Sequence, residues 1–229
     1  MRIVVLGGTN GLGALCTQHL LKSGARVLAT GRNLDKATFA REWLDTLSLL
    51  RFAYPEQPVR EAASAAKDAL GKPLHALIHC FGPVLAKPIG ETSPAELTLL
   101  LQANAIAFHE ALLEFAPLLE NGSGRIIAFS AAGADTLSSK HMLPAYFAAK
   151  SAQLSLVRSW ARQLAPQGIT VNAIGLGAFS GELKMDTSRV PMGRLGEKDD
   201  IGAALDYLLA KEAGYVTGAF IPISGGYSV

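Results

Sequence analysis

Seven short apolar runs alternate with longer segments of helical pattern along nearly the whole chain, and this alternation limits the fold more than any other feature. The runs are rich in valine, isoleucine and leucine, as strands buried on both faces are. Strands separated by helices form right-handed βαβ units, and repeated units build a parallel sheet. We expect strands at Ile3–Leu6, Ala25–Thr30, Leu47–Phe52, Leu74–Cys80, Arg125–Ser130, Ile169–Ile174 and Gly218–Ile223.

Helical patterns fill the gaps between these strands. They predict helices at about Leu12–Ser23, from the second strand to about Asp45, at Glu61–Leu70, Pro94–Leu119, Pro144–Ala165 and Lys198–Leu209. No repeat, low-complexity tract or linker interrupts the 229 residues. We therefore expect a single α/β domain over residues 1–229, a Rossmann-type doubly wound sheet of seven parallel strands with helices on both faces.

Composition and charge narrow the class of protein. Hydrophobic residues make up 49 % of the chain, which argues against disorder, and 21 basic residues nearly balance 19 acidic ones without a basic run. We therefore expect neither nucleic acid nor a membrane as a partner. The chain has no apolar run of membrane-spanning length and no signal-peptide core. Its two cysteines, Cys16 and Cys80, fall in segments expected to be buried, which favours reduced thiols in a cytoplasmic protein.

A glycine-rich loop, GGTNGLG, follows the first strand directly and opens the first helix. Glycines permit positive φ angles and a close approach of backbone to ligand, and the N–H groups of the helix that follows can point at a pyrophosphate. A tight strand–helix turn without a ligand is the alternative. We expect a dinucleotide site made by Gly7, Thr9, Asn10, Gly11, Leu12 and Gly13.

The end of the second strand bears on which dinucleotide is bound. An acidic residue there would bind the ribose 2′-hydroxyl of NAD, but the chain has no acid before Asp35. Arg32 stands there instead, and a guanidinium can pair with a 2′-phosphate. A solvated arginine is the alternative. The sequence favours NADPH or NADP, with NAD as the second choice.

Several motifs in the same chain order carry a resemblance to a known family. They are G7-x-x-x-G11-x-G13, Asn104 in the long helix, Ser130 at a strand end, Y146-x-x-x-K150, VNAIGLG at 171–177, PMGRLG at 191–196, YVTG at 215–218 and ISGG at 223–226. In this combination the chain resembles the short-chain dehydrogenases/reductases over nearly its whole length. The C-terminal motifs are most similar to 3-oxoacyl-[acyl carrier protein] reductases. The resemblance implies a nicotinamide cofactor and a homo-oligomer, often a tetramer formed through two long helices.

The resemblance gives Tyr146 and Lys150 a chemical role. Reducing a ketone requires a hydride on carbon and a proton on oxygen, and a tyrosine hydroxyl can supply the proton. On a helix, Lys150 lies one turn from Tyr146 on the same face. A cation about 4 Å away favours the phenolate by about 4 kcal/mol at an effective dielectric near 20, or up to about three pKa units before desolvation is subtracted. An ordinary amphipathic helix with a snorkelling lysine is the alternative.

Further roles follow from the resemblance alone. Ser130 would hydrogen-bond the substrate carbonyl, and Asn104 would hold a water of the proton relay behind the lysine. Lys150 would also bind the nicotinamide ribose, and the backbone at Gly177 and Phe179 would meet the nicotinamide amide. The serine assignment has alternatives: an ungapped alignment places that position at Ala131, and Ser138 or Ser139 in the following loop could substitute.

The chain also departs from the family pattern. The family's Asn-Asn-Ala-Gly after the fourth strand is replaced by His79-Cys80-Phe81-Gly82, whose last three residues we expect to contact the adenosine side through their backbone. The short segment between Gly177 and Pro191 suggests an open site for a bulky or carrier-bound substrate. His75 and His79 would lie roughly 13 Å apart on a strand, too far for one zinc ion, so we expect no metal.

The resemblance therefore implies an NADPH-dependent reductase that transfers a hydride to a ketone, with a 3-oxoacyl or polyketide-like substrate. Two alternatives remain. A catalytically silent NADP(H)-binding sensor or scaffold would have the same fold. An enoyl reductase is suggested by the similarity of HCFG to that branch, although that branch spaces its tyrosine and lysine more widely.

Overall fold

The strands of the computed structural model form one parallel sheet, and the structure describes residues 1–34, 39–141, 143–180 and 187–227. The sheet has seven strands in the order β3-β2-β1-β4-β5-β6-β7, and every neighbouring pair is parallel. The predicted fold class is confirmed. The strands are β1 (Arg2–Leu6), β2 (Arg26–Gly31), β3 (Leu47–Arg51), β4 (Ala76–His79), β5 (Arg125–Ala131), β6 (Thr170–Leu176) and β7 (Phe220–Ile223).

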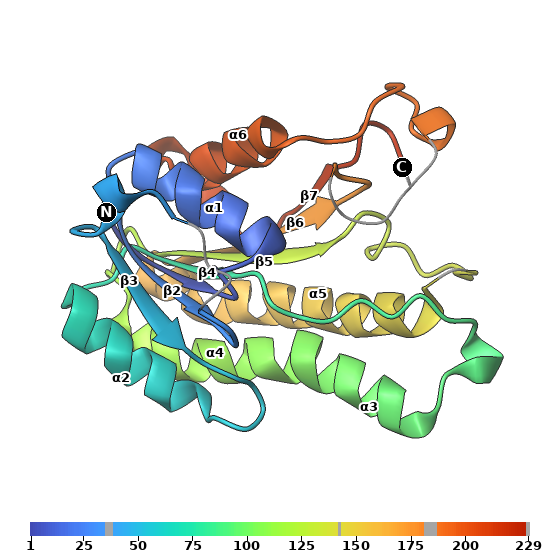
Figure 1. Ribbon diagram of the computed structural model, residues 1–229, viewed down its shortest axis with the longest axis horizontal. Coiled ribbons are helices and arrows are strands. Elements are labelled where there is room, and N and C mark those ends of the chain that lie inside the picture. The colour runs from blue at the N-terminus through green and yellow to red at the C-terminus, as the bar shows by residue number, and fades with distance from the viewer. Residues whose placement is uncertain (35–38, 142, 181–186, 228–229) are drawn as a thin grey trace.

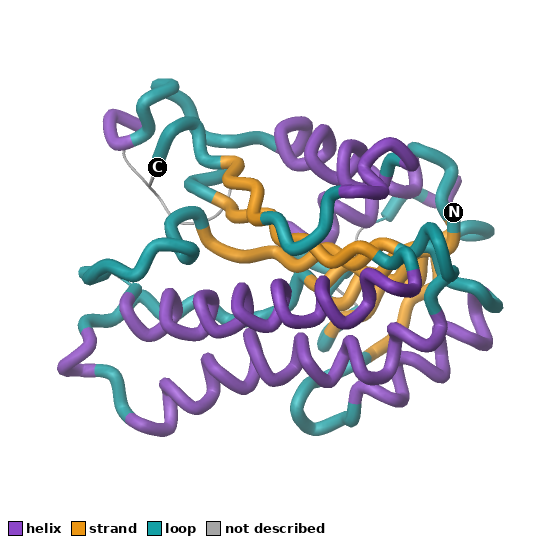
Figure 2. The backbone as a smooth tube through the Cα atoms, turned by 180° about the vertical axis from the view of Figure 1, so that it is seen from behind, coloured by secondary structure: helices purple, strands orange, loops and turns teal. Residues whose placement is uncertain are grey.

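Helices cover both faces of the sheet. Figure 1 shows α1 (Gly11–Lys22) and α6 (Lys198–Leu209) together on one face, with α2 (Val59–Leu70), α4 (Ala107–Phe115) and α5 (Pro144–Leu164) on the other. The view from behind in Figure 2 shows the same two layers. The chain builds outward from β1 to β3 on one side and from β4 to β7 on the other. Ligands of such sheets bind at this reversal, beyond the carboxyl ends of the strands.

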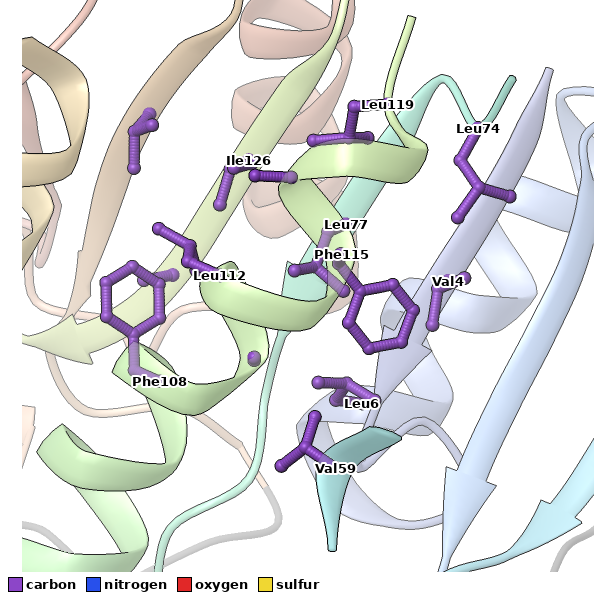
Figure 3. Packing of buried hydrophobic residues seen from close by; sticks show 14 of the residues in the cluster. Val4, Leu6, Val59, Leu74, Leu77, Phe108, Leu112, Phe115, Leu119 and Ile126 are labelled. Atoms are coloured by element: carbon purple, nitrogen blue, oxygen red, sulfur yellow. The ribbon is translucent and has the colours of Figure 1, made fainter. Parts of the chain in front are cut away.

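Alternation along the strands divides the core between the two faces. On β1, Val4 and Leu6 pack toward α2, α4 and α5, whereas Ile3 and Val5 pack toward α1 and α6. Figure 3 shows the first of these layers, in which Phe115 of α4 lies near Val4 and Leu6. Fully burying an apolar side chain of this size contributes about 1.5–3 kcal/mol, so both layers hold the strand ends firmly in place.

The long helix expected at 94–119 contains a wide turn. It begins as α3 (Pro94–Leu101), where Ser93 and Glu96 form a reciprocal capping box, and continues into a π-helical turn at Gln102–Ile106 before α4. A π turn inserts an extra residue into the helical ladder and is frequent at functional sites. Here it places Asn104, which is fully buried, on the inner side of the helix.

The helix expected to reach Asp45 is absent from the described part of that connection. Residues 35–38 lie outside the described residues, and the chain from Phe39 to Asp45 contains a single 3₁₀ turn, Arg41–Trp43. Phe39 and Trp43 pack against the core, but Leu44 is 73 % exposed. The segment therefore has too little apolar surface on one side to support an amphipathic helix.

Among the described residues, no helix combines the length and apolar character needed to cross a bilayer. Both cysteines, Cys16 and Cys80, are free thiols. The expectation that residues 1–229 form one domain stays a prediction.

Candidate active site

The glycine-rich loop between β1 and α1 is closed tightly by contacts that only glycine permits. Gly7 has a φ of +79° and Gly11 a φ of +51°, a region that other residues rarely adopt. A Cβ atom on Gly13 would overlap the carbonyl oxygen of Gly7, and one on Gly8 would stand 2.7 Å from Oγ1 of Thr17. The loop therefore brings the start of α1 directly over the end of β1.

The N-terminus of α1 is open for an anion. Its N-cap residue, Asn10, makes no side-chain cap hydrogen bond, and its first turn has no acidic residue. The first backbone N–H groups of a helix have no acceptor within the helix, and here those include Gly11, Leu12 and Gly13. By contrast, α3 and α6 are both closed by capping boxes. The loop thus fits the pyrophosphate of a dinucleotide, in which anionic oxygens would accept from these N–H groups.

Contacts with β2 hold the glycine-rich loop in place. The N–H of Gly7 donates to Oγ1 of Thr30 over 3.0 Å. Thr9 is buried against Gly31, where a Cβ atom would overlap the Thr9 hydroxyl. Thr30 was not among the predicted site residues, although a hydroxyl at the end of an apolar strand was the available signal. Arg32 follows, exposed and without an ion pair to another described residue, while Asp35 lies outside the described residues.

The segment HCFG, which begins at the last residue of β4, meets the same loop through its backbone. A Cβ atom on Gly7 would lie 3.0 Å from the backbone nitrogen of Phe81, so the two backbones pack together. The ring of Phe81 packs instead with aromatic side chains, 4.4 Å from the His79 ring and 5.9 Å from the Tyr54 ring between centroids. Cys80 is partly buried beside Cys16, and burial raises the pKa of the Cys80 thiol. The segment therefore offers the cofactor side mainly backbone groups.

Gly82 and Asn104 connect this segment to the long helix. Gly82 has a φ of +144°, and a Cβ atom there would overlap Oδ1 of Asn104. The Asn104 amide donates to the carbonyl of Leu100 over 3.0 Å, but its Oδ1 is buried with no hydrogen-bond partner among the described residues. An orphaned buried acceptor is suited to an internal water.

Tyr146 and Lys150 lie on the first turns of α5, which starts at Pro144. The Lys150 Nζ atom is 5.7 Å from the centre of the Tyr146 ring. Lys150 is only 5 % exposed, and its ammonium donates to the carbonyl of Phe129 over 2.7 Å and to Oε1 of Gln153 over 3.3 Å. Burial lowers the pKa of Lys150 to about 7. The Lys150 amine, which gains and loses its proton near neutral pH, therefore lies next to the partly buried ring of Tyr146.

Ser130 lies near the end of β5, on the strand face that also carries Ala128. It is 3 % exposed, and its Oγ has no hydrogen-bond partner among the described residues. The neighbouring Ala131 is buried as well. Ser138 and Ser139 instead line a surface cavity of about 640 Å³ with Thr136, Leu137, Lys140, Pro144, Phe147, Ala148 and Ser151, and Tyr146 is not part of that lining.

Gly177 and Phe179 follow β6 in a well-packed loop. The N–H of Gly177 donates to the carbonyl of Ile223 over 2.9 Å, and a Cβ atom on Gly177 would lie 2.7 Å from the Ser224 Cα. Phe179 is buried, with its ring against Gly196. Residues 181–186 of the short segment before Pro191 lie outside the described residues, and the open site expected there stays a prediction.

His79 is a core residue, as expected, with its ring fully buried against Phe81 and Phe108. Burial lowers its pKa to about 3. Its Nδ1 lies 3.5 Å from Nε2 of Gln153, a residue that the sequence reasoning missed. Within the ranges described above, no three histidine, cysteine, aspartate or glutamate side chains gather as they would around a metal ion.

Comparisons with known proteins agree with the fold. A family model described as enoyl-(acyl carrier protein) reductase matches residues 7–228. Nodulation protein G from Azospirillum brasilense is 30 % identical over 97 % of this chain and 96 % of its own length. Acetoacetyl-CoA reductase from Allochromatium vinosum is 26 % identical over 97 % of this chain and 96 % of its own length.

A solved structure shows the same fold with a cofactor bound. The blue fluorescent protein from a metagenomic library, in complex with NADPH, is 26 % identical and superimposes with a TM-score of 0.87 over 99 % of this chain and 97 % of that one. The fold, the glycine-rich loop and the Tyr146–Lys150 pair thus occur together in a chain that matches its relatives from end to end. The chain is an oxidoreductase that belongs to the short-chain dehydrogenase/reductase family.

Proposed function

We propose that this protein is an NADPH-dependent reductase that transfers a hydride to a ketone, with a 3-oxoacyl or polyketide-like compound as the substrate class. The observation that carries the proposal is the buried Lys150 ammonium 5.7 Å from the Tyr146 ring. Two comparisons support it: one relative is named as an acetoacetyl-CoA reductase, and one structural neighbour is described in complex with NADPH.

Tyr146 is the proposed proton donor. NADPH, when bound with its pyrophosphate at the start of α1, supplies the hydride that adds to the carbonyl carbon. The Tyr146 hydroxyl gives its proton to the carbonyl oxygen in the same step, which leaves a phenolate on the enzyme and an alcohol as the product. The Lys150 ammonium stabilises that phenolate because it lies close to the ring and is itself buried.

Asn104 and Ser130 complete the proposed proton path and carbonyl site. An internal water on the orphaned Oδ1 of Asn104 would return a proton through Lys150 to Tyr146. The Ser130 hydroxyl, which has no hydrogen-bond partner among the described residues, would donate to the carbonyl oxygen. Because its Oγ is buried, substrate must open a path to it, and Ala131, Ser138 and Ser139 remain the alternative positions for this role.

The residue that follows β2 supports the proposal that the enzyme prefers NADPH to NADH. The exposed Arg32 guanidinium is available for the 2′-phosphate of NADPH, a contact that NADH cannot make. The loop residues 7–13, the backbone of 80–82 and the backbone at Gly177 and Phe179 would hold the rest of the dinucleotide.

We also propose a homo-oligomer in the cytoplasm. Leu99, Ile106 and Leu113 are spaced by seven residues along the helical region from α3 to α4, and each is about half exposed. The π turn at Gln102–Ile106 interrupts the regular α-helical spacing, so these three side chains are exposed apolar positions along one helical region and do not form a single straight stripe. A second copy packing along this region would bury them, which supports an assembly through the long helices.

An enoyl reductase is the second candidate, favoured by the description of the matching family model. The deciding experiment supplies NADPH with a panel of 3-oxoacyl thioesters, other 1,3-dicarbonyl compounds and enoyl thioesters, and follows the absorbance of the reduced nicotinamide. We expect one NADPH to be consumed for each hydroxyl formed from a 3-oxo compound. Turnover of enoyl thioesters alone would identify the second candidate, and tight NADPH binding without turnover of any compound would identify a silent sensor.

A further inference from the structure

A chain of buried polar side chains runs behind the Tyr146–Lys150 pair. The Lys150 ammonium donates to Oε1 of Gln153 over 3.3 Å, and Nε2 of Gln153 lies 3.5 Å from Nδ1 of His79. Both Gln153 and His79 are fully buried. Lys150 and Gln153 lie on α5, and His79 lies at the end of β4. Their contacts therefore connect α5 to the centre of the sheet.

The chemistry of the three side chains decides which atoms donate and which accept in these contacts. A lysine ammonium only donates hydrogen bonds, so the Gln153 oxygen must face Lys150 and its NH₂ group must face His79. Burial lowers the pKa of His79 to about 3 and keeps the ring neutral, and in the tautomer that carries its proton on Nε2 the Nδ1 atom accepts from the Gln153 NH₂ group. His79 thereby prevents the Gln153 amide from turning its NH₂ group toward the ammonium. The Nε2 atom of His79 is buried without a partner among the described residues.

No ion pair to a carboxylate is found for Lys150 among the described residues. The titratable groups that face it are Tyr146 on α5, and His79 and Cys80 at the end of β4. His79 is neutral near pH 7, and burial raises the pKa of the Cys80 thiol, so it is neutral there as well. The buried ammonium is therefore stabilised by carbonyl dipoles, those of Phe129 and Gln153, and loss of either acceptor would destabilise the charged form.

We propose that Gln153, oriented by His79, is a positioning residue that keeps the Lys150 side chain charged and directed behind Tyr146. The proposal rests on the proposed function, in which this charge stabilises the Tyr146 phenolate. The proposal gives a role to Gln153 and His79, whose burial is not explained by packing alone. Two apolar side chains of similar size would fill the same space and leave no buried polar group without a hydrogen-bond partner.

The first test is the pH dependence of turnover in a Gln153→Met variant, which keeps side-chain length and removes the acceptor. Without the Gln153 oxygen the Lys150 ammonium loses its proton at lower pH. We expect the alkaline limb of the kcat profile to move down by about one pH unit, the size expected for one hydrogen bond to a charged group. Gln153→Glu, which restores an acceptor and adds a negative charge, should move the limb upward.

The matched control is the Gln163→Leu variant. Gln163 is an exposed glutamine on the same helix, so its replacement should leave the alkaline limb of the kcat profile unchanged. His79→Phe provides a second variant: it keeps a buried ring but removes the acceptor for the Gln153 NH₂ group. We expect it to move the limb in the same direction as Gln153→Met by a smaller amount. If Gln153→Met does not fold, this variant still tests the proposal.

A second readout does not depend on activity. The pKa of Lys150 is lowered in the folded state from 10.5 to about 7, so the folded protein binds fewer protons than the unfolded chain between these values. The free energy of unfolding should therefore rise with pH across that window. In the Gln153→Met variant the rise in the free energy of unfolding should begin about one pH unit lower. This shift would appear even if no ketone were turned over, so failure of the proposed function can be told from failure of this inference.

The outcome that overturns the inference is a Gln153→Met variant in which neither the alkaline limb nor the onset of the stability rise moves. Gln153 would then be a packing residue whose loss affects thermal stability alone. A shift in both measurements, reversed in sign by Gln153→Glu, is the result that we expect.

Discussion

The two sides of the site are built by different means. On the proposed dinucleotide side, at the ends of β1 and β2, the structure relies on backbone: Gly7 and Gly13 pack so closely that no side chain fits, and the first turn of α1 offers bare N–H groups. On the proposed catalytic side, at the ends of β4 and β5, at the π turn of the long helix and along α5, it relies on buried polar side chains such as Asn104 and Lys150.

This difference explains how the HCFG segment can depart from the family pattern. Phe81 meets the glycine-rich loop through its backbone, so its side-chain identity matters little to the dinucleotide side. His79 occupies the face toward α5, where it pairs with Gln153. A backbone-built site tolerates side-chain changes, whereas a change within a buried polar network requires a compensating partner.

The largest effect that would sharpen this comparison is expected for Gly13→Ala. The added Cβ would overlap the Gly7 carbonyl oxygen and force the loop apart, which we expect to raise the Kd for NADPH by about 10- to 100-fold, the equivalent of a 1–3 kcal/mol packing penalty. Binding is measured by fluorescence titration of the reduced nicotinamide. Gly90→Ala is the matched control, because a Cβ there meets nothing within 4 Å. A Kd for Gly13→Ala equal to that of the control would break the comparison.

A smaller effect is expected for a side chain on the same dinucleotide side. Arg32→Ala removes one exposed guanidinium, so we expect the KM for NADPH to rise about fivefold, in the range of a surface charge pair, with the KM for NADH unchanged. Steady-state kinetics with both cofactors give the ratio of the KM for NADPH to the KM for NADH. Arg60→Ala, an exposed arginine at the start of α2, removes the same charge elsewhere. Equal changes for both cofactors would show that Arg32 does not read the 2′-phosphate.

The sequence was sufficient for features that repeat or that have a fixed local geometry. The alternation of apolar runs predicted all seven strands, and the glycine spacing predicted the loop whose tight packing the structure shows. The helical spacing of Tyr146 and Lys150 predicted that the two side chains would meet. These features depend on neighbours in the chain, which a sequence displays directly.

Features that depend on packing between distant segments were not predicted. Gln153 looks like any polar residue on a helix, and only the approach of β4 reveals that it is buried against His79. The π turn around Asn104 and the absence of an α-helix at residues 39–45 likewise depend on how much apolar surface neighbouring elements can cover. The choice among Ser130, Ala131 and the loop serines requires a bound substrate, because both strand residues are buried.

The most direct test of the central claim is the turnover of a Tyr146→Phe variant with NADPH and the best 3-oxo substrate. The change removes one hydroxyl and keeps the ring that lies beside Lys150. We expect kcat to fall by about 10²- to 10⁴-fold, the usual contribution of a positioned proton donor, with the Kd for NADPH unchanged. Tyr207→Phe, an exposed tyrosine on α6, is the control. A Tyr146→Phe enzyme with the kcat of that control would contradict the assignment of Tyr146 as the proton donor.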